Sequence, residues 1–464
     1  MRYGFAVDIG TTNIEISLWN LDACDVNPIN KDTLFKVLSQ HPASATSSAL
    51  QASIVAMQGT CWLRTFENSH NKIVLSCDSS VSSATSVAFR AIPLKTRIVR
   101  NCLYVYGADV VSRILYAHYN GVEKLQSKLV AQLKSEFDAM LGEVESETFA
   151  GAVAAARGDS SFRAERVVAR AVFTGNTVML HFLSGLSVSG FEKAPFTPVS
   201  LFGGAEPAAS ALASLADEVV LPPCIGAFLG ADIVCASLSV ESDAATAGTA
   251  QRAHNEPNVV IDVGTNTEIM LVDADGKRTA CSAAAGPAFE GGGLSVEMKG
   301  SALVAELARM LDEGVMDETG YIGEKPASGK SGMDNADKRR TALNQQDVRQ
   351  LQLAKGATAA AVETLLQSVG LDAAGIKKCF ICGNFGNALD IDAVKKTGLL
   401  PAALAEKAVY AGNAALRGAE LILLSKTAAL PHAAEIAANT VVLQLADSAV
   451  FAEKYIQRMN FVEF

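Results

Sequence analysis

Two short stretches of this chain nearly repeat each other: Asp8-Ile9-Gly10-Thr11-Thr12-Asn13 and Asp262-Val263-Gly264-Thr265-Asn266-Thr267. Each follows an apolar run that is typical of a buried strand, at 4–7 and at 259–261. Each is followed by an alternating run that predicts a second strand, at 14–18 and at 268–271. The sequence therefore predicts the same strand–turn–strand unit twice, once near the N-terminus and once past the middle.

The residues of both turns suit the binding of phosphate groups. Gly10 and Gly264 let the backbone turn sharply and approach an anion closely. Successive N–H groups in such a turn form a concave anion site, and neutral side chains can add further donors. The side chains that we assign to phosphate contact are Thr11, Thr12, Asn13, Thr265 and Asn266.

Asp8 and Asp262 come directly before the two turns. A carboxylate at that point can hold Mg²⁺ through water or orient an attacking water. One such turn is weak evidence, since an ordinary hairpin can carry it. Two copies in matching strand contexts indicate a duplicated nucleotide-binding core, and hence an ATPase that uses ATP and Mg²⁺.

A third candidate segment is the Gly-rich run at 286–293, which contains Glu290. We assign Glu290 and Gly291 to the vicinity of the nucleotide or of Mg²⁺. A structural salt bridge of Glu290 is the alternative.

A fourth candidate segment is Cys382-Gly383-Asn384-Phe385-Gly386-Asn387, which follows a predicted strand at 378–381. Without side chains at Gly383 and Gly386, this turn can lie flat against an adenine or a ribose. Asn384 tolerates left-handed backbone conformations and suits the same turn. We therefore assign these three residues to nucleoside binding.

The composition limits the class of protein. At 464 residues the chain is long enough for two or three domains. Its net charge of −10 argues against nucleic acid or an anionic membrane surface as the main partner. We find no apolar run of transmembrane length, and Asp8 falls where a signal peptide would be apolar. We therefore expect a cytoplasmic protein with no membrane partner and no nucleic-acid partner.

The nine cysteines indicate a reducing compartment, because their number is odd and they are scattered through apolar surroundings. Only Cys379 and Cys382 have a spacing that metal sites use. They lie on a predicted apolar strand without a second pair, so we interpret both as core residues. We expect no iron–sulfur cluster in this chain.

Two predicted helices, at 226–236 and at 412–421, are rich in small residues, which suits helices that cross between two lobes. The order is then phosphate hairpin, crossing helix, phosphate hairpin, Gly-rich turn and crossing helix. This order resembles the superfamily of actin, sugar kinases and heat-shock-chaperone ATPases, the ASKHA superfamily. The resemblance implies an α/β fold of two ribonuclease-H-like lobes around a central nucleotide cleft.

We place the N-terminal lobe at 1–235, with the first hairpin and an elaborated insert at 23–95 to which we assign no chemistry. The C-terminal lobe is placed at 236–464, with the second hairpin, the nucleoside turn and a last helix that crosses back. Closure of such a cleft converts the state of the nucleotide into movement.

Further blocks resemble one branch of this superfamily, the ATP-dependent reductive activators of corrinoid proteins. One block is Gly175-Asn176-Thr177-Val178-Met179-Leu180-His181, and another is Gly398-Leu399-Leu400-Pro401. The others lie at 101–114, 222–232, 285–291 and 347–357. Together they span most of the chain outside 23–95.

The resemblance implies a protein that hydrolyses ATP and helps to return a Co(II) corrinoid protein of methyl-transfer metabolism to Co(I). This electron transfer is uphill, and about 59 mV changes a one-electron equilibrium tenfold. Members of the branch usually carry an iron–sulfur domain ahead of the first hairpin, whereas three residues precede Gly4 here. We therefore expect a corrinoid protein and a separate electron-donor protein as partners.

Two other functions remain open. Thr267 and Asn384 stand where the branch tends to have Gly. Thr267 and the missing iron–sulfur domain favour a non-catalytic, actin-like nucleotide sensor, whereas Asn384 is compatible with the turn. A small-molecule kinase of the same superfamily would use the same cleft, although we find no diagnostic motif for its substrate. The oligomeric state is also open, with a homodimer as one option.

Several polar residues have an ordinary structural role as their default. Asp109 and Arg113 are four apart on one predicted helix, the spacing of an intrahelical ion pair. Asp232 either faces the cleft or caps a neighbour. We assign Asn176 and His181 to packing and hydrogen bonding rather than to catalysis.

Overall fold

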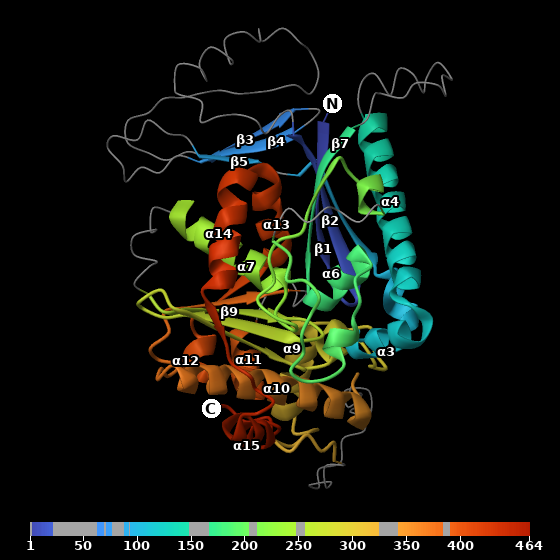
Figure 1. Ribbon diagram of the computed structural model, residues 1–464. Helices are drawn as coiled ribbons and strands as arrows, with labels where there is room; N and C mark the ends of the chain where they lie inside the picture. The colour runs from blue at the N-terminus through green and yellow to red at the C-terminus, as the bar shows by residue number, and fades with distance from the viewer. Residues whose placement is uncertain are drawn as a thin grey trace, which may run out of the picture.

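The computed structural model describes residues 2–21, 63–68, 71–76, 88–91, 93–147, 167–203, 211–246, 256–323, 342–383 and 390–464. Two mixed β-sheets form its framework, and helices lie between them and outside them (Figure 1). Each sheet contains one of the two predicted hairpins. We call the first sheet with its helices lobe I and the second sheet with its helices lobe II.

The sheet of lobe I has the order β6-β2-β1-β7-β8. Strands β1 and β2 form the antiparallel hairpin, β6 continues antiparallel beside β2, and β7 and β8 extend the sheet in parallel. The interior of β1 is almost wholly buried, which explains its continuous apolar run. The strands are β1 Arg2–Ile9, β2 Asn13–Asn20, β6 Lys95–Arg100, β7 Val167–Gly175 and β8 Glu218–Val220.

The sheet of lobe II repeats this arrangement. Its order is β13-β12-β9-β10-β11-β14. Read from β11 to β13, this is β11-β10-β9-β12-β13, in which the five strands β9 to β13 stand as third, second, first, fourth and fifth. The five strands of lobe I stand in the same order. The additional strand β14 pairs in parallel with β11. The strands are β9 Asn258–Val263, β10 Thr267–Val272, β11 Arg278–Ala283, β12 Lys378–Cys382, β13 Ala408–Gly412 and β14 Thr440–Val442. The two hairpins therefore occupy equivalent positions in two lobes of the same topology.

A separate antiparallel sheet, β3-β4-β5, comes from the segment that we expected to be an insert. Its strands are β3 Leu63–Asn68, β4 Asn71–Ser76 and β5 Ala88–Ala91. Other residues of 22–92 lie outside the described part of the chain, so the role of this segment stays open.

Helices α3, α4 and α6 pack on one face of the first sheet and enclose the core of lobe I (Figure 1). Phe137 of α4 stacks on Phe5 of β1 with ring centroids 3.8 Å apart and also lies beside Phe173 of β7. The helices are η1 Cys102–Tyr106, α3 Val110–Asn120, α4 Val122–Glu147, α6 Thr177–Ser184, η2 Ser189–Phe191 and η3 Leu212–Ser214.

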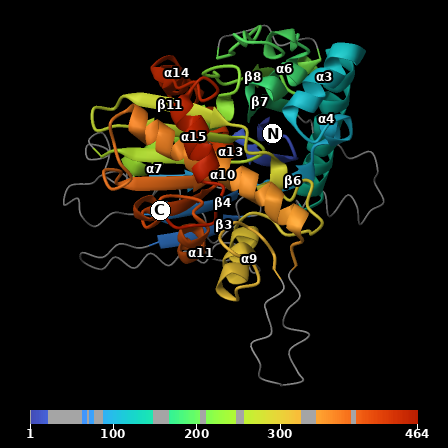
Figure 2. The same cartoon turned by 90° about the horizontal axis from the view of Figure 1, so that it is seen from below.

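In lobe II, α10 packs along β10 and β11, and α15 covers the outer side of α10 (Figure 2). Helices α9 and α11 pack against each other and close the same core. The helices are η4 Pro287–Glu290, α9 Ser301–Asp312, α10 Gln345–Ser368, α11 Ile391–Thr397, α12 Ala402–Ala405 and α15 Ala449–Gln457.

Helices α7 Ala231–Thr246 and α13 Ala414–Leu424 lie between the two sheets, and α14 Lys426–Ala438 packs beside both (Figure 1). The two helices approach closely, because a Cβ added at Gly418 would lie 2.0 Å from the carbonyl oxygen of Cys235. Their core also contains side chains from both sheets, such as Ala6 and Val260. The expected close packing of two small-residue helices between the lobes is confirmed.

Three details refine the expectations from sequence. The first crossing helix begins at Ala231, because 226–230 forms a turn in which Gly226 bridges Leu229. The second crossing helix is not the last one, since α14 and α15 follow it. Cys379 and Cys382 are buried in β12 with free thiols, as predicted for core residues.

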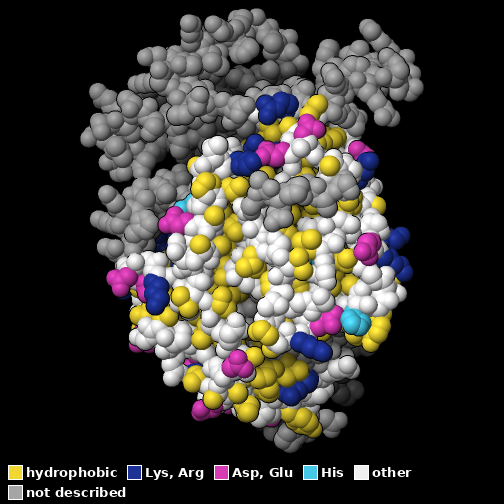
Figure 3. All heavy atoms as spheres, in the orientation of Figure 1, with side chains coloured by type: hydrophobic (Ala, Val, Ile, Leu, Met, Phe, Trp, Pro, Cys, Tyr) yellow, Lys and Arg dark blue, Asp and Glu magenta, His cyan; other side chains and the backbone are white. Residues whose placement is uncertain are grey.

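The surface carries interspersed charges on the face seen in Figure 3, where acidic and basic side chains alternate without a large patch of either sign. Within the described residues, no helix is both long enough and apolar enough to span a bilayer.

Candidate functional site

The two Gly-Thr turns come from different lobes and meet at the junction between them. In the first turn, a Cβ at Gly10 would lie 2.8 Å from the carbonyl oxygen of Asn13, so the turn leaves no room for a side chain. In the second, the N–H of Gly264 donates to the carbonyl of Asn266 at 3.0 Å. The residues buried in the two turns are Thr11, Thr12 and Thr265, while Asn13 and Asn266 keep partial exposure.

Glu290 joins the two turns. It ends the short helix η4 and is 8% exposed. Its Oε2 accepts a hydrogen bond from Thr12 Oγ1 at 3.0 Å and another from Thr265 Oγ1 at 2.5 Å. A single carboxylate oxygen therefore bridges the lobes through the same two hydroxyls that the sequence predicts for phosphate contact.

Each hairpin also places two acidic residues side by side. Asp8 lies directly opposite Glu15 in β1–β2, and Asp262 lies directly opposite Glu268 in β9–β10. Opposite residues of an antiparallel pair share one face, so each hairpin carries a pair of neighbouring carboxylates. Our sequence analysis named the aspartates and missed the glutamates. The signal was present, because each second strand of the repeat carries a Glu within its apolar run.

Asn413 connects lobe II to the first of these pairs. Its Oδ1 accepts from the N–H of Leu416 and so caps the start of α13. Its Nδ2 donates to Asp8 Oδ2 at 2.9 Å and to Glu15 Oε2 at 2.8 Å. The amide thus supplies two donors to two neighbouring carboxylates, a role that no local sequence pattern reveals.

Burial and mutual repulsion raise the pKa values of these acids. Burial raises the pKa of Asp262 to about 7, and the charges of Asp232 and Glu290 add to the effect. Burial also raises the pKa of Asp232 to about 6. Burial likewise raises the pKa values of Asp8 and Glu268 well above their ordinary range. The junction therefore concentrates acidic groups whose ionised forms a bound cation would stabilise.

The site suits a hydrated magnesium ion better than a directly ligated metal. Among the described residues, no three His, Cys, Asp or Glu side chains are arranged to hold a metal ion. Mg²⁺ usually keeps several waters and binds proteins through one or two carboxylates together with phosphate oxygens. Asp8 and Asp262 remain partly exposed, so a hydrated ion can reach them. The residues present therefore fit Mg²⁺ bound with a nucleotide.

Equivalent glycines lie beside the hairpin in both lobes. A Cβ at Gly383, where φ is +89°, would lie 2.6 Å from Asp262 Oδ1. A Cβ at Gly175, where φ is +149°, would lie 2.7 Å from the carbonyl oxygen of Ile9. Gly383 follows β12 and Gly175 ends β7, which are equivalent strands of the two sheets. Gly291, with φ of +81°, directly follows Glu290 and is the C-cap of η4.

Two predicted site residues, Asn384 and Gly386, fall in 384–389, outside the described residues. Their assignment to nucleoside binding stays a prediction.

Of the two alternatives for Asp232, the structure shows the hydrogen bond to a neighbour, because its Oδ1 accepts from the N–H of Ile233 at the start of α7. Its charge also raises the pKa of Asp262. The predicted ion pair of Asp109 and Arg113 is wrong. Asp109 instead caps α3 by accepting from the N–H and the hydroxyl of Ser112, and Arg113 is directed into the lobe.

His181 is buried, with its Nδ1 2.7 Å from the carbonyl oxygen of Thr177 and its Nε2 accepting from a backbone N–H, which confirms a structural role. Asn176 caps α6 and also contacts the first turn, where its Nδ2 lies 3.4 Å from Thr11 Oγ1. Thr267 begins β10 with an ordinary backbone conformation, and its hydroxyl lies 3.0 Å from Thr358 Oγ1. The side chain at Thr267 therefore packs on α10 and leaves the turn intact.

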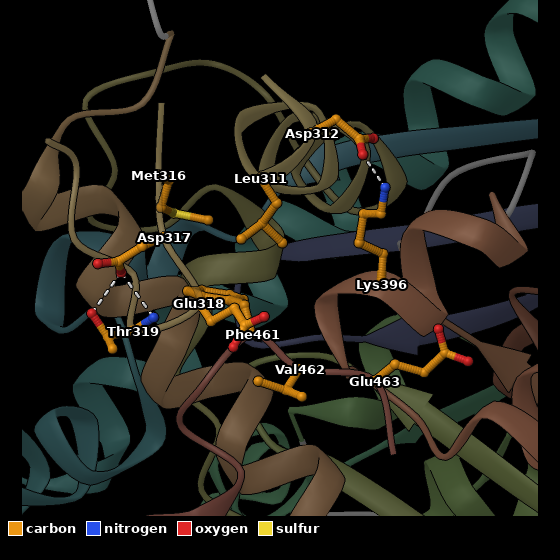
Figure 4. A pocket seen from close by; sticks show the side chains of 10 residues that line it. All are labelled: Leu311, Asp312, Met316, Asp317, Glu318, Thr319, Lys396, Phe461, Val462 and Glu463. Atoms are coloured by element: carbon orange, nitrogen blue, oxygen red, sulfur yellow. Dashed lines mark hydrogen bonds and ion pairs between the residues drawn. The ribbon is translucent and has the colours of Figure 1, made fainter. Parts of the chain in front are cut away.

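A pocket of about 760 Å³ lies elsewhere, where α9, α11 and the C-terminal segment meet (Figure 4). Its apolar wall includes Leu311, Met316 and Phe461, and the ion pair of Lys396 with Asp312 lies at its edge. None of its lining residues belongs to either turn, so we do not assign it to the nucleotide.

Comparisons with known proteins place the chain in a family. The family model of the RACo middle region matches residues 92–244. The model of the C-terminal domain of RACo, the ASKHA domain, matches 256–329 and 296–463. Corrinoid activation enzyme RamQ of Eubacterium limosum is 26% identical over 412 residues, which cover 77% of this chain and 64% of RamQ.

A solved structure of a reductive activator for corrinoid, iron–sulfur protein matches with a TM-score of 0.67 and 22% identity, covering 100% of this chain and 66% of that chain. This chain thus spans about two thirds of the length of both relatives. The structural match and the ASKHA family model confirm the predicted fold of two lobes. Since the two models together match most of the chain, the protein belongs to the RACo family, and its C-terminal part is an ASKHA domain.

Proposed function

We propose that this protein binds ATP with Mg²⁺ between its two Gly-Thr turns and hydrolyses it to help return a Co(II) corrinoid protein to Co(I). A separate donor protein supplies the electron, so that Co(II) gains one electron and becomes Co(I). RamQ and the solved relative are named for corrinoid activation, and the solved relative has the same fold. The corrinoid protein is therefore the partner that we assign to this chain.

The observation that carries the proposal is the bridge made by Glu290. Two turns that lie far apart in the sequence converge on one carboxylate oxygen, with Asp8 and Asp262 at the adjoining strand ends. In the proposal, phosphate oxygens accept from the hydroxyls of Thr12 and Thr265, which must then leave Glu290. Since Glu290 belongs to lobe II and Thr12 to lobe I, nucleotide binding changes a contact between the lobes.

Mg²⁺ would neutralise phosphate charge and be held through water by Asp8 and Asp262. Glu290, released from the two threonines, would lie near the terminal phosphate and orient the attacking water. Asn413, at the start of α13, donates to Asp8 from lobe II, so a movement of α13 would shift or break this hydrogen bond. These roles connect the state of the nucleotide to the relative position of the lobes.

Phosphate release by the purified protein tests the proposal. Turnover is measured with and without a Co(II) corrinoid protein, in the presence of a chemical reductant, while the absorbance of the corrinoid follows Co(I) formation. Asp8→Ala removes a proposed magnesium contact, and Asp138→Ala on the exposed face of α4 serves as the matched control. We expect the corrinoid protein to stimulate turnover in the wild type and the control, and Asp8→Ala to abolish it.

Two results would favour the other functions. Tight ATP binding without turnover in either condition would indicate a nucleotide sensor. Transfer of the phosphoryl group to a small metabolite, with no effect of the corrinoid protein, would indicate a kinase.

A further inference from the structure

Behind the first Gly-Thr turn lie two buried polar residues that our sequence analysis did not assign to the site. Asn101 precedes the short helix η1 and is 1% exposed, and Arg113 belongs to α3 and is 0% exposed. A fully buried arginine is costly unless its donors are satisfied. Both side chains are directed at the backbone of the turn.

Together these two residues hold three successive carbonyl oxygens. Asn101 Nδ2 donates to the carbonyl of Gly10 at 2.8 Å, and the N–H of Asn101 donates to that of Thr12 at 3.0 Å. Arg113 Nη2 donates to the carbonyl of Thr11 at 2.6 Å. The carbonyls of all three residues of the turn therefore face η1 and α3.

This arrangement determines where the N–H groups of the turn point. In a planar trans peptide, the N–H is directed opposite to the carbonyl of the preceding residue. The carbonyls of Gly10, Thr11 and Thr12 are held on one side of the turn. The N–H groups of the residues that follow them, Thr11, Thr12 and Asn13, are therefore directed to the other side. Successive N–H groups on one side form an anion-binding concavity.

Arg113 also contributes charge. Its other described hydrogen bonds run from Nε to the carbonyl of Gly107 at 2.9 Å and from Nη1 to the sulfur of Met179 at 3.3 Å. The acceptors of these three hydrogen bonds are all neutral, and the charges of Asp109 and Glu290 also act on the guanidinium. An anion on the opposite side of the same peptide groups would be attracted by it.

We propose that Asn101 and Arg113 are positioning residues that hold the first turn in its phosphate-binding shape from behind. The proposal rests on nucleotide binding at this turn, as inferred above. It assigns to α3 a role in the site, which Arg113 exerts through the backbone carbonyl of Thr11. Simple packing of α3 within lobe I is the competing explanation, and it would not discriminate between ligands with and without phosphate.

The test compares ATP, ADP and adenosine binding by titration calorimetry, with adenosine measured by competition against ATP. The variants are Asn101→Ala, Arg113→Met and Arg113→Lys. Arg97→Gln is the matched control, because Arg97 is a half-buried arginine of lobe I whose ion pairs with Glu136 and Glu143 lie on the α4 side. Melting temperatures without ligand report whether each variant folds.

Asn101→Ala and Arg113→Met each remove side-chain donors that hold the first turn. Each should therefore weaken ATP binding by about 10- to 100-fold. Adenosine binding should change less than about threefold. Arg113→Lys, which keeps the positive charge but has a single donor nitrogen in place of the guanidinium, should recover part of the loss. The Arg97→Gln control should bind ATP like the wild type.

If Arg113→Met does not fold, ATP and adenosine binding are compared in Arg113→Lys and Asn101→Ala alone. Equal losses for ATP and adenosine, or ATP affinity unchanged in folded variants, would overturn the positioning role while leaving ATP binding intact. A wild-type protein that does not bind ATP would instead refute the proposed function itself, and the positioning role with it.

Discussion

Replacing Asp262 with Asn should stabilise the nucleotide-free protein while it removes function. The pKa of Asp262 is raised from 3.8 to about 7 in the folded protein. At 1.36 kcal/mol per pKa unit, a shift of this size means that ionisation of the carboxyl lowers the free energy of unfolding by about 4 kcal/mol. Asp262 is partly exposed, and its titration is coupled to that of the neighbouring acids. We therefore expect Asp262→Asn to gain roughly half of this free energy, about 2 kcal/mol, at pH 8.

The direction with pH follows from the sign of the shift. A carboxyl whose pKa is higher in the folded state than in the unfolded chain holds its proton longer when folded. The wild type should therefore lose stability as the pH rises from about 4 through about 7. Asp262→Asn, which cannot ionise at this position, should lose less over that window.

Urea denaturation without Mg²⁺ and without nucleotide, followed by circular dichroism at pH 5 and pH 8, measures this effect. Asp138→Asn, an exposed change on α4, is the control for the loss of one negative charge. The expected gain of Asp262→Asn over the wild type is larger at pH 8 than at pH 5. A variant that is no more stable than the wild type at pH 8, or a difference independent of pH, would refute the reasoning.

Gly383→Ala should lower the melting temperature by several degrees, because its Cβ would meet a carboxylate and a carbonyl at 2.6 and 2.8 Å with φ at +89°. Gly142→Ala, where nothing lies within 4 Å, should leave it unchanged or raise it, and a drop of equal size there would argue against steric strain. Asn413→Asp should destabilise the protein at pH 8 more than at pH 4, since it replaces a donor shared by two carboxylates with a third acid; equal melting curves at both pH values would contradict this. Mg²⁺ with a non-hydrolysable ATP analogue should raise the melting temperature more at pH 8 than at pH 6, because more of the acids are ionised, and a pH-independent shift would contradict the charge argument.

Local sequence pattern predicted the hairpins because their cause is local. Strand periodicity, a Gly that allows a tight turn and the repetition of both features are visible within a dozen residues of Asp8 and of Asp262. The residue types of the turns are also local, which is why Thr12 and Thr265 were among the side chains assigned to phosphate contact. The Gly-rich run around Glu290 signalled an unusual loop but not the contact that it makes.

The residues that escaped prediction act across long distances in the chain. Asn413 reaches Asp8 over 405 positions, and Arg113 reaches Thr11 over 102 positions. Spacing on one helix suggested a partner for Arg113 four residues away, whereas the folded lobe offers backbone carbonyls that are better placed. Which partner a long side chain selects is decided by tertiary packing, and a single sequence contains no direct record of it.

The dependence of lobe I on α13 has a consequence for synthesis of the protein on the ribosome. Helix α13 packs on β1 and β7, and Asn413 at its start supplies the amide for Asp8. At about 5–20 residues per second, a nascent chain needs on the order of 20–80 s to advance from the first hairpin to that amide. During this interval the apolar side of β1 that faces α13 stays uncovered by it, and the first acidic pair has no donor from Asn413. Lobe I therefore completes its fold only after α13 has been made, and a chaperone that shields lobe I until then would raise the yield of active protein.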